Sequence, residues 1–230
     1  MIALILARGG SKRVPLKNIA PFLGKPLLSH VVQTAHASQL FSQVFVSTDH
    51  PEIAKVAQEN GASVLERPAH LAGDFSTTLE VAANAASTLK LEANTDLCVL
   101  YATSVLLKAE YLKEALQALQ TNPLKKYAFA CSIYSSSPYR SFHIQDNTPT
   151  PLFNDNMQKR SQDLPPLYHD AGLFYLGQVK HFLAKEPLLA PHSWPLILPQ
   201  VCVQDIDSFE DLTLAALKYT ALHEDDSPLC

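Results

Sequence analysis

Charged residues are scarce in this chain, and their balance excludes one large class of function. Only 17% of the 230 residues are Asp, Glu, Lys or Arg, and the formal net charge is −4. A protein of that charge does not bind nucleic acid through a general excess of positive charge. Any binding of anions must therefore come from a local cluster of basic residues.

Long apolar runs and paired cysteines are also missing. No apolar run approaches the roughly 18 residues that a membrane span needs. The first run ends at Arg8 and has no basic segment before it, which argues against a signal peptide. The four cysteines are far apart, without a Cys-x-x-Cys pair. We therefore expect reduced thiols, a cytoplasmic protein and no membrane partner.

Hydrophobic residues are plentiful, at 47% of the chain, and they follow an alternating pattern. This amount and the length predict a single domain over residues 1–230. Strands are expected at 2–7, 44–47, 62–65, 97–102, 127–134 and 171–176, and helices at 26–38, 51–60, 77–91, 109–120 and 208–222. Such alternation predicts a three-layer α/β fold with a mostly parallel sheet. Pro195 and Pro199 predict an edge strand or extended connection within 194–203.

One stretch breaks the alternation. Residues from about 135 to 168 are rich in Pro, Ser, Asn and Gln and have no sustained periodicity. A structureless loop of that length is unusual inside a compact domain. We therefore expect short strands or a hairpin there, in an arm at about 135–170 that leaves the sheet.

The most informative motif follows the first strand, where two of only seven glycines are adjacent. Gly9 and Gly10 allow a tight turn and close approach of a ligand to the backbone. Four cations lie within ten residues of each other, namely Arg8, Lys12, Arg13 and Lys17. A loop of this kind suits a polyphosphate, although its spacing matches neither a Walker A loop nor a dinucleotide fingerprint. The plain alternative is a solvated basic turn.

A second motif is a pair of carboxylates before the last helix. Asp205 and Asp207 are two residues apart, so an extended backbone presents both on one side. Two carboxylates that close suit a hard cation such as Mg²⁺. The alternative is that Asp207 caps the final helix and Asp205 is solvated. Ser47-Thr48-Asp49 ends another strand, and we interpret it as a cap for the next helix.

These motifs carry a resemblance to a known family. Residues 6–18, Leu-Ala-Arg-Gly-Gly-Ser-Lys-Arg-Val-Pro-Leu-Lys-Asn, resemble the nucleotide loop of CMP-nonulosonic acid synthetases, which are sugar cytidylyltransferases. Residues 204–207, Gln-Asp-Ile-Asp, resemble the family's second metal motif. Residues 160–175 and the Tyr-Ala-Thr at 101–103 are most similar to the branch that uses pseudaminic acid. The resemblance runs from residue 2 to about 215.

The resemblance implies a Rossmann-like nucleotidyltransferase fold and a reaction. CMP would pass from CTP to the anomeric hydroxyl of a nonulosonic acid, with pseudaminic acid as the expected sugar, and pyrophosphate would be released. The implied catalytic residues are Arg8, Lys17 and Asp207, with Lys17 at the α-phosphate. The implied nucleotide-binding residues are Gly9, Gly10, Ser11, Lys12, Arg13, Asn18, Arg67, Ala102 and Thr103. The sugar would contact Tyr101, Arg160, Gln162, His169 and Asp170, while Asp205 and Asp207 would hold Mg²⁺.

The resemblance also implies a homodimer in which the arm of one subunit reaches its partner's site. Arg160 suits the sugar carboxylate as a bidentate donor, although it could equally be a surface arginine, and Arg67 could simply end a strand. Adjacent residues point apart in an extended chain, so we do not expect His169 and Asp170 to form a catalytic pair.

Three departures from the branch bear on the choice of sugar. The branch usually has Gln at position 173, Trp at 176 and Pro at 105, whereas this chain has Leu173, Leu176 and Val105. We expect the first two to remove polar or aromatic character from a sugar-facing strand. Two alternatives therefore stay open. One is a cytidylyltransferase for sialic, legionaminic or deoxy-octulosonic acid, and the other is a non-catalytic nucleotide-binding relative.

Overall fold

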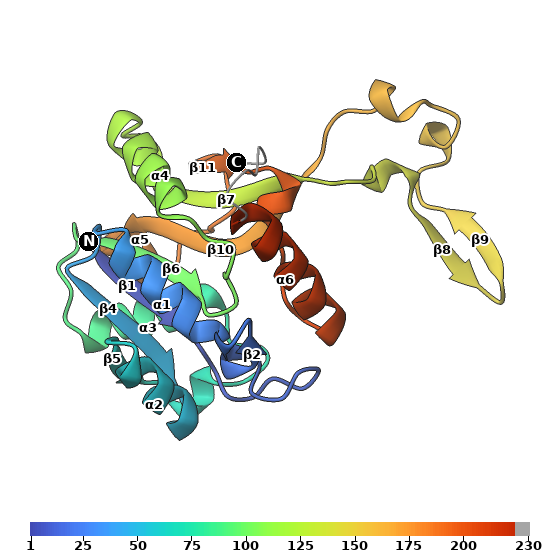
Figure 1. The fold of residues 1–230 in the computed structure, drawn as a ribbon. Coiled ribbons are helices and arrows are strands. Elements are labelled where there is room, and N and C mark those ends of the chain that lie inside the picture. Colours follow the sequence, from blue (N-terminus) through green and yellow to red (C-terminus); the bar gives the residue numbers. More distant parts are fainter. Residues whose placement is uncertain (224–230) are drawn as a thin grey trace.

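A seven-stranded sheet forms the centre of the molecule in the computed structural model, which describes residues 1–223 (Figure 1). The sequence predicts a frayed tail at residues 224–230, and this segment lies outside the described residues. The sheet order is β11-β7-β10-β6-β1-β4-β5. The strands are β1 (Ile2–Leu6), β4 (Gln43–Thr48), β5 (Ser63–Glu66), β6 (Asp96–Tyr101), β7 (Tyr127–Ile133), β10 (Tyr168–Gln178) and β11 (Ser193–Ile197).

The neighbours pair in parallel except at β10, which runs antiparallel to both β6 and β7. The expected mostly parallel sheet is therefore confirmed, although the reversal at β10 was not predicted. β11 lies at the edge of the sheet, where a strand that contains Pro195 loses no ladder hydrogen bond.

Helices cover both faces of the sheet, which gives the predicted three layers. The helices α1 (Leu27–Ala37), α2 (Pro51–Glu59) and α4 (Ala109–Thr121) share one apolar cluster, and α3 (Thr78–Thr88) and α5 (Val179–Leu183) share the other. Alternate residues of β1 enter the two clusters. Ala3 and Ile5 belong to the first, and Ile2 and Leu4 to the second. Both faces of β1 are thus buried, which explains its uninterrupted apolar sequence.

Local signals set the ends of two helices that border the site. Thr77 caps α3 in a capping box, because its Oγ1 accepts from the Glu80 amide and the Glu80 carboxylate accepts from the Thr77 amide. The spacing of Ser208 and Asp211 in the sequence also predicts a capping box, and these residues form it at the start of α6 (Phe209–His223). α3 ends three residues earlier than predicted, ahead of Lys90, which has a left-handed φ of 50°.

A third apolar cluster fixes the carboxylate pair. Ile206 is fully buried against Phe22, Leu27 and Ala215, and it is the residue between Asp205 and Asp207. Its burial turns both flanking carboxylates to the other side of the chain. Phe22 belongs to a short ribbon made of β2 (Pro21–Phe22) and β3 (Lys25–Pro26).

The chain between β7 and β10 leaves the sheet as an extended arm (Figure 1). It contains a hairpin of β8 (Phe142–Gln145) and β9 (Thr148–Pro151), so the predicted arm and its hairpin are confirmed. Asp146 and Asn147 both have positive φ, as a two-residue hairpin turn requires. Phe142 and Ile144 on the hairpin are 50% and 70% exposed.

Cys98 and Cys131 are buried free thiols, as expected. Cys202 is not a free thiol, so the prediction of a reduced cysteine is wrong at that position. The predicted thiol at Cys230 lies outside the described residues. None of the helices within residues 1–223 combines the length and apolar character that crossing a bilayer requires.

Candidate active site

A cavity of about 660 Å³ opens at the carboxyl ends of β1 and β6. That volume lies in the usual range for sites that hold small molecules, and the carboxyl ends of strands are where open α/β sheets bind ligands. Most predicted site residues line it, namely Arg8, Ser11, Lys12, Arg13, Lys17, Asn18, Arg67, Tyr101, Ala102, Thr103, Asp170, Asp205 and Asp207. Gly9, Gly10, Arg160, Gln162 and His169 are not in its lining.

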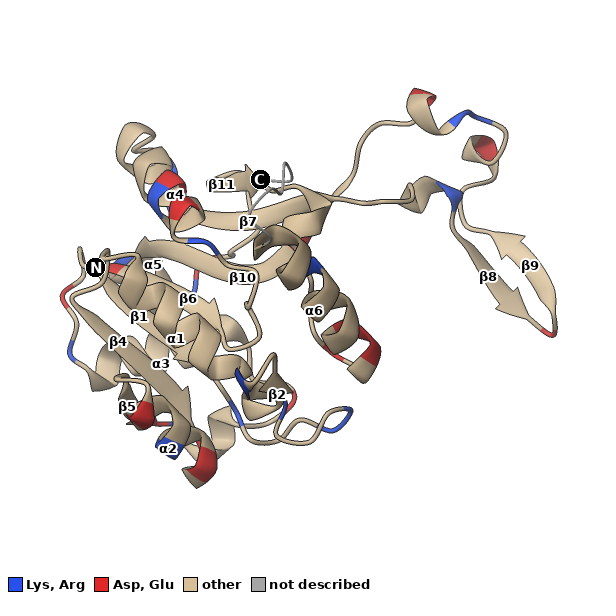
Figure 2. Cartoon of the chain, in the orientation of Figure 1, with Lys and Arg blue, Asp and Glu red and all other residues tan. Residues whose placement is uncertain are grey.

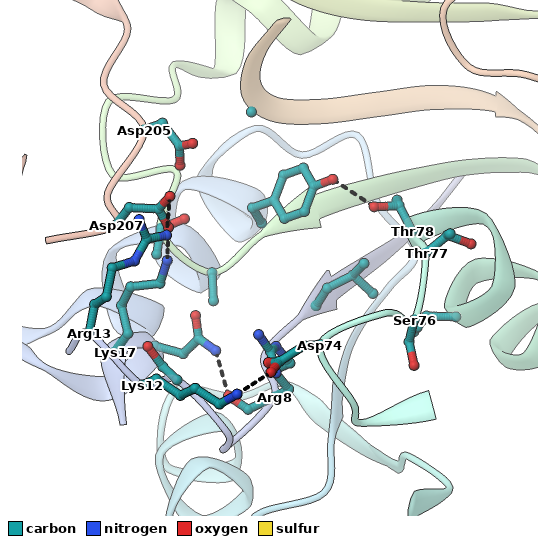
Figure 3. A pocket seen from close by; sticks show the side chains of 18 of the residues that line it. Arg8, Lys12, Arg13, Lys17, Asp74, Ser76, Thr77, Thr78, Asp205 and Asp207 are labelled. Carbon is teal, nitrogen blue, oxygen red and sulfur yellow. Dashed lines mark hydrogen bonds and ion pairs between the residues drawn. The ribbon is translucent and has the colours of Figure 1, made fainter. Parts of the chain in front are cut away.

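The four cations of the loop all point towards carboxylates at the cavity wall (Figure 3). Two of them share Asp207: Arg13 Nη2 lies 2.5 Å from its Oδ2, and Lys17 Nζ lies 2.9 Å from its Oδ1. Figure 2 shows basic segments on the loop between β1 and β2. The local positive cluster expected from the sequence is therefore present.

Asp74 holds the other two cations. Its Oδ1 lies 2.7 Å from Arg8 Nη1, and its Oδ2 lies 2.6 Å from Lys12 Nζ. Hydrogen bonds from Lys12 and Arg8 lower the pKa of Asp74. The residue lies in the loop before α3, so two segments about sixty residues apart meet across the cavity.

The backbone of the glycine loop is already partly engaged. The Gly9 amide donates to Asp49 Oδ1 at 2.8 Å, and the Ser11 amide donates to the Gly9 carbonyl at 2.9 Å. A cradle of three free amides is thus not preformed. A Cβ on Gly9 would come within 2.8 Å of the His50 ring, so only glycine fits there.

Asp49 therefore secures the loop rather than capping the next helix, which corrects our interpretation of the Ser-Thr-Asp motif. The cap of α2 is His50, whose Nδ1 accepts from the Glu52 amide. Asn18 also acts on the loop: it is buried, and its Nδ2 donates to the Arg8 carbonyl at 2.8 Å. These contacts hold the start of the basic loop close to the end of β1.

Asp205 and Asp207 differ in their electrostatic surroundings. The hydrogen bond from Lys17 has the largest effect on Asp207 and lowers its pKa; burial opposes this shift, and Arg13 adds a further lowering effect. Asp205 is open to the cavity, but the protein packed around its carboxyl group, followed by the charge of Asp207, raises its pKa. Among residues 1–223, Asp205 forms no ion pair of its own, so the pair concentrates negative charge.

The donors present fit Mg²⁺, which prefers oxygen ligands and is often held by one or two carboxylates together with substrate phosphates. Among residues 1–223, no group of three or more His, Cys, Asp or Glu side chains is arranged to hold a metal. Asp205 and Asp207 would therefore hold the ion jointly with oxygens of the substrate.

Arg67 is buried and still reaches the cavity. Its Nε donates to Ser47 Oγ at 3.2 Å and its Nη2 to the Ser47 carbonyl at 2.8 Å. Burial lowers its pKa to about 10, so it remains a cation at neutral pH. Arg67 directly follows β5 and also lines the cavity, and its contact with a nucleotide stays a prediction.

Tyr101 and Asp170 form part of the cavity wall beyond the basic loop. The Tyr101 hydroxyl lies 2.7 Å from Thr78 Oγ1, and the Tyr101 ring packs edge-on against Tyr175. Asp170 accepts from the Tyr175 hydroxyl and from the Gly172 amide. The strand register shifts between Asp170 and Tyr175, so a β-bulge aims this carboxylate.

His169 and Asp170 point apart, as expected from an extended chain. Asp170 lines the main cavity, whereas His169 lines a neighbouring cavity of about 400 Å³. Asp205 and Asp207 border both cavities. The His169 ring packs on Tyr134, with ring centroids 4.9 Å apart.

Arg160 and Gln162 lie on the arm, outside the lining of the main cavity. The Arg160 side chain is 72% exposed and forms a bidentate pair with Asp163, at 2.8 and 2.9 Å. Gln162 is also exposed. Within residues 1–223 of one subunit, the structure therefore does not bring these two predicted sugar contacts to the site.

The three departures from the pseudaminic acid branch fall in the core. Leu173, Leu176 and Val105 are 1%, 0% and 4% exposed, and the two leucines pack in the cluster shared with α1 and α4. The expectation that they alter a sugar-facing surface is wrong, because these side chains are buried, whereas Asp170 of the same strand lines the cavity.

Some lining residues were missed from the sequence: Asp74, Ser76, Thr77, Thr78 and Gly172. The Thr77–Glu80 capping box was the available signal, because it marks the beginning of a helix whose first turn could face a ligand.

The chain is similar to known cytidylyltransferases over most of its length. The family model described as "Cytidylyltransferase" matches residues 2–216. A pseudaminic acid cytidylyltransferase of Campylobacter jejuni is 38% identical over 227 residues, which cover 97% of each chain. A longer Helicobacter pylori protein, pseudaminic acid cytidylyltransferase and UDP-2,4-diacetamido-2,4,6-trideoxy-beta-L-altropyranose hydrolase, is 42% identical over 90% of this chain, and the match spans 40% of that protein.

A solved structure of CMP:2-keto-3-deoxy-manno-octonic acid synthetase with CTP has the same fold. Its TM-score is 0.69 at 16% identity, with 97% of this chain and 98% of that chain covered. At that identity the likeness supports the fold alone, whereas the family model and the relative from Campylobacter jejuni bear on the kind of enzyme. On these matches, the chain belongs to the cytidylyltransferase family.

Proposed function

We propose that this enzyme transfers CMP from CTP to the anomeric hydroxyl of a nonulosonic acid and releases pyrophosphate. The observation that carries the proposal is the meeting of Lys17 and Asp207 at 2.9 Å across the cavity. It joins a cationic loop suited to a triphosphate with a carboxylate pair suited to a divalent cation. The identity to pseudaminic acid cytidylyltransferases supports pseudaminic acid as the sugar.

The residues of the loop would stabilise the charge that develops on the phosphates during in-line attack. Lys17, whose side chain is only 18% exposed, would lie at the α-phosphate, and Arg8, Lys12 and Arg13 would neutralise the remaining charge. Asp205 and Asp207 would hold Mg²⁺, which supplies further positive charge at the phosphates. Because Lys17 lowers the pKa of Asp207, that carboxylate suits metal binding better than removal of the sugar proton.

The sugar would lie against Tyr101 and Asp170, which line the cavity. Arg160 and Gln162 would contribute from the arm of a second subunit in a homodimer, because their own arm extends away from the sheet (Figure 1). We place the enzyme in the cytoplasm, where CTP is available to it. Its reaction would be one step in the formation of cell-surface glycans.

The test is pyrophosphate release from CTP and Mg²⁺, with pseudaminic acid and N-acetylneuraminic acid compared side by side. Release with pseudaminic acid alone would support both the reaction and the sugar. Release only with N-acetylneuraminic acid would keep the reaction and overturn the sugar. CTP binding without release, with either sugar or with legionaminic or deoxy-octulosonic acid, would identify a non-catalytic relative.

A further inference from the structure

Asp74 occupies the place where a phosphate group would be expected. Each of its two carboxylate oxygens takes one cation, Arg8 on one side and Lys12 on the other (Figure 3). Arg8 Nη1 lies 3.4 Å from the Gly10 carbonyl as well, so the guanidinium is folded onto the glycine loop. The carboxylate thus mimics an anionic ligand of the loop.

Asp207, the second carboxylate that binds loop cations, differs from Asp74 because it is also a proposed metal ligand. Asp207 would be a ligand of the proposed Mg²⁺, which would leave Arg13 and Lys17 free for phosphate. Asp74 has only Arg8 and Lys12 as ion-pair partners within residues 1–223, and its side chain is 38% exposed. A ligand that claims those two cations must therefore displace Asp74 into solvent.

We propose that Asp74 competes with the pyrophosphate part of the substrate for Arg8 and Lys12, moving out when CTP binds and returning as pyrophosphate leaves. The inference rests on the proposed function. Contacts that bind a product as tightly as the substrate slow its release and do nothing for the chemical step. By weakening the binding of both CTP and pyrophosphate, Asp74 sets the affinity for CTP and speeds the departure of pyrophosphate.

The competition depends on which phosphates a ligand carries. CMP ends at the α-phosphate, beside Lys17 in the proposed arrangement, and leaves the Asp74 pairs intact. CTP and pyrophosphate both carry the groups that would claim Arg8 and Lys12. CMP is therefore an internal control for any change at Asp74.

The experiment is calorimetric binding of CTP, pyrophosphate and CMP to the wild type and to Asp74→Asn, with Mg²⁺ present and no sugar. Loss of two exposed ion pairs is expected to lower the Kd for CTP and for pyrophosphate about three- to ten-fold, more at low ionic strength. The Kd for CMP should not change. Asp74→Glu, which keeps the charge, should restore the weaker binding.

Glu59→Gln is the matched control. Glu59 forms a surface ion pair with Lys55 on α2, 3.8 Å apart, and its substitution changes the net charge equally. It should leave all three Kd values unchanged. Unchanged or weaker binding of CTP and pyrophosphate to Asp74→Asn would overturn the inference, as would an equal gain for CMP. Failure of the wild type itself to bind CTP would contradict the proposed function instead.

Discussion

The cavity and the arm of this protein hold their polar residues in opposite ways. In the cavity, Lys17 and Asp207 come from distant segments and are fixed by direct contact, with the buried Ile206 and Asn18 beside them. On the arm, Arg160 pairs with a residue only three positions away and is largely exposed. The cavity is thus organised within one subunit, whereas the arm has groups available to another molecule.

This contrast assigns separate roles to the two regions. A site for phosphate chemistry needs charges held in place before the reaction begins, and the carboxyl edge of the sheet provides that. The arm carries exposed apolar side chains, such as Phe142 and Ile144, and also the exposed Arg160, whose guanidinium suits a carboxylate. We therefore expect substitutions in the cavity to affect the reaction itself, and those on the arm to affect the use of the sugar.

The largest effect is expected from Lys17→Ala. Removing one preorganised charge from a transition state typically costs about 10²- to 10³-fold in kcat, and Lys17 is the least exposed ion-pair cation of the loop. Steady-state pyrophosphate release measures the loss. Lys55→Ala, on the surface of α2, is the matched control and should retain full activity. A loss below about ten-fold would mean that Lys17 does not contact the reacting phosphate.

Arg160→Ala should distinguish the role of the arm in sugar binding from the role of the cavity in nucleotide binding. The loss of a bidentate charged hydrogen bond is expected to raise the KM for the sugar about ten-fold or more and to leave the KM for CTP unchanged. Arg140→Ala, another exposed arginine of the arm, serves as the control. An equal rise in both KM values would show that the arm also binds the nucleotide, and the separation of roles would fail.

A smaller effect is expected from a change of pH, which should alter the Mg²⁺ concentration that the enzyme needs. Burial and the charge of Asp207 raise the pKa of Asp205, so protons compete with Mg²⁺ as the pH falls through that raised value. The Mg²⁺ concentration needed for half-maximal rate should therefore rise on acidification. In Asp205→Asn this part of the pH dependence should disappear. An Mg²⁺ requirement in the wild type that does not change with pH would contradict the assignment of Asp205 as a ligand.

The smallest effect on activity is expected from Leu173→Gln, although the fold should suffer. The Gln amide would be buried among apolar residues such as Leu28 and Ala171, without hydrogen-bond partners. We expect this to lower the free energy of unfolding by about 1–3 kcal/mol, as measured by denaturation. The KM for either substrate should not change. A lower KM for the sugar would place residue 173 at the sugar after all.

The sequence predicted those parts of the molecule that depend on local pattern. The apolar run of β1, the capping box at Ser208 and the two-residue spacing of Asp205 and Asp207 each have a local physical cause, and each reached its predicted place. Even the arm was indicated by its lack of periodicity.

What the sequence could not predict depends on contacts between distant segments. Asp74 reaches the basic loop only because β1 and the chain before α3 meet at one edge of the sheet. The side to which Leu173 and Leu176 point was predicted wrongly, because the bulge and the antiparallel direction of β10 leave no clear pattern in the sequence. In our proposal, the position of Arg160 relative to a sugar site depends on a second subunit.

The most direct test of the central claim is ³¹P nuclear magnetic resonance of the products formed from CTP and pseudaminic acid. Attack at the α-phosphate in the cavity predicts equal amounts of one phosphodiester, the CMP-sugar, and pyrophosphate. Formation of CDP or of inorganic phosphate as a primary product would show attack at another phosphate, and would contradict the placement of Lys17 and the carboxylate pair around the α-phosphate.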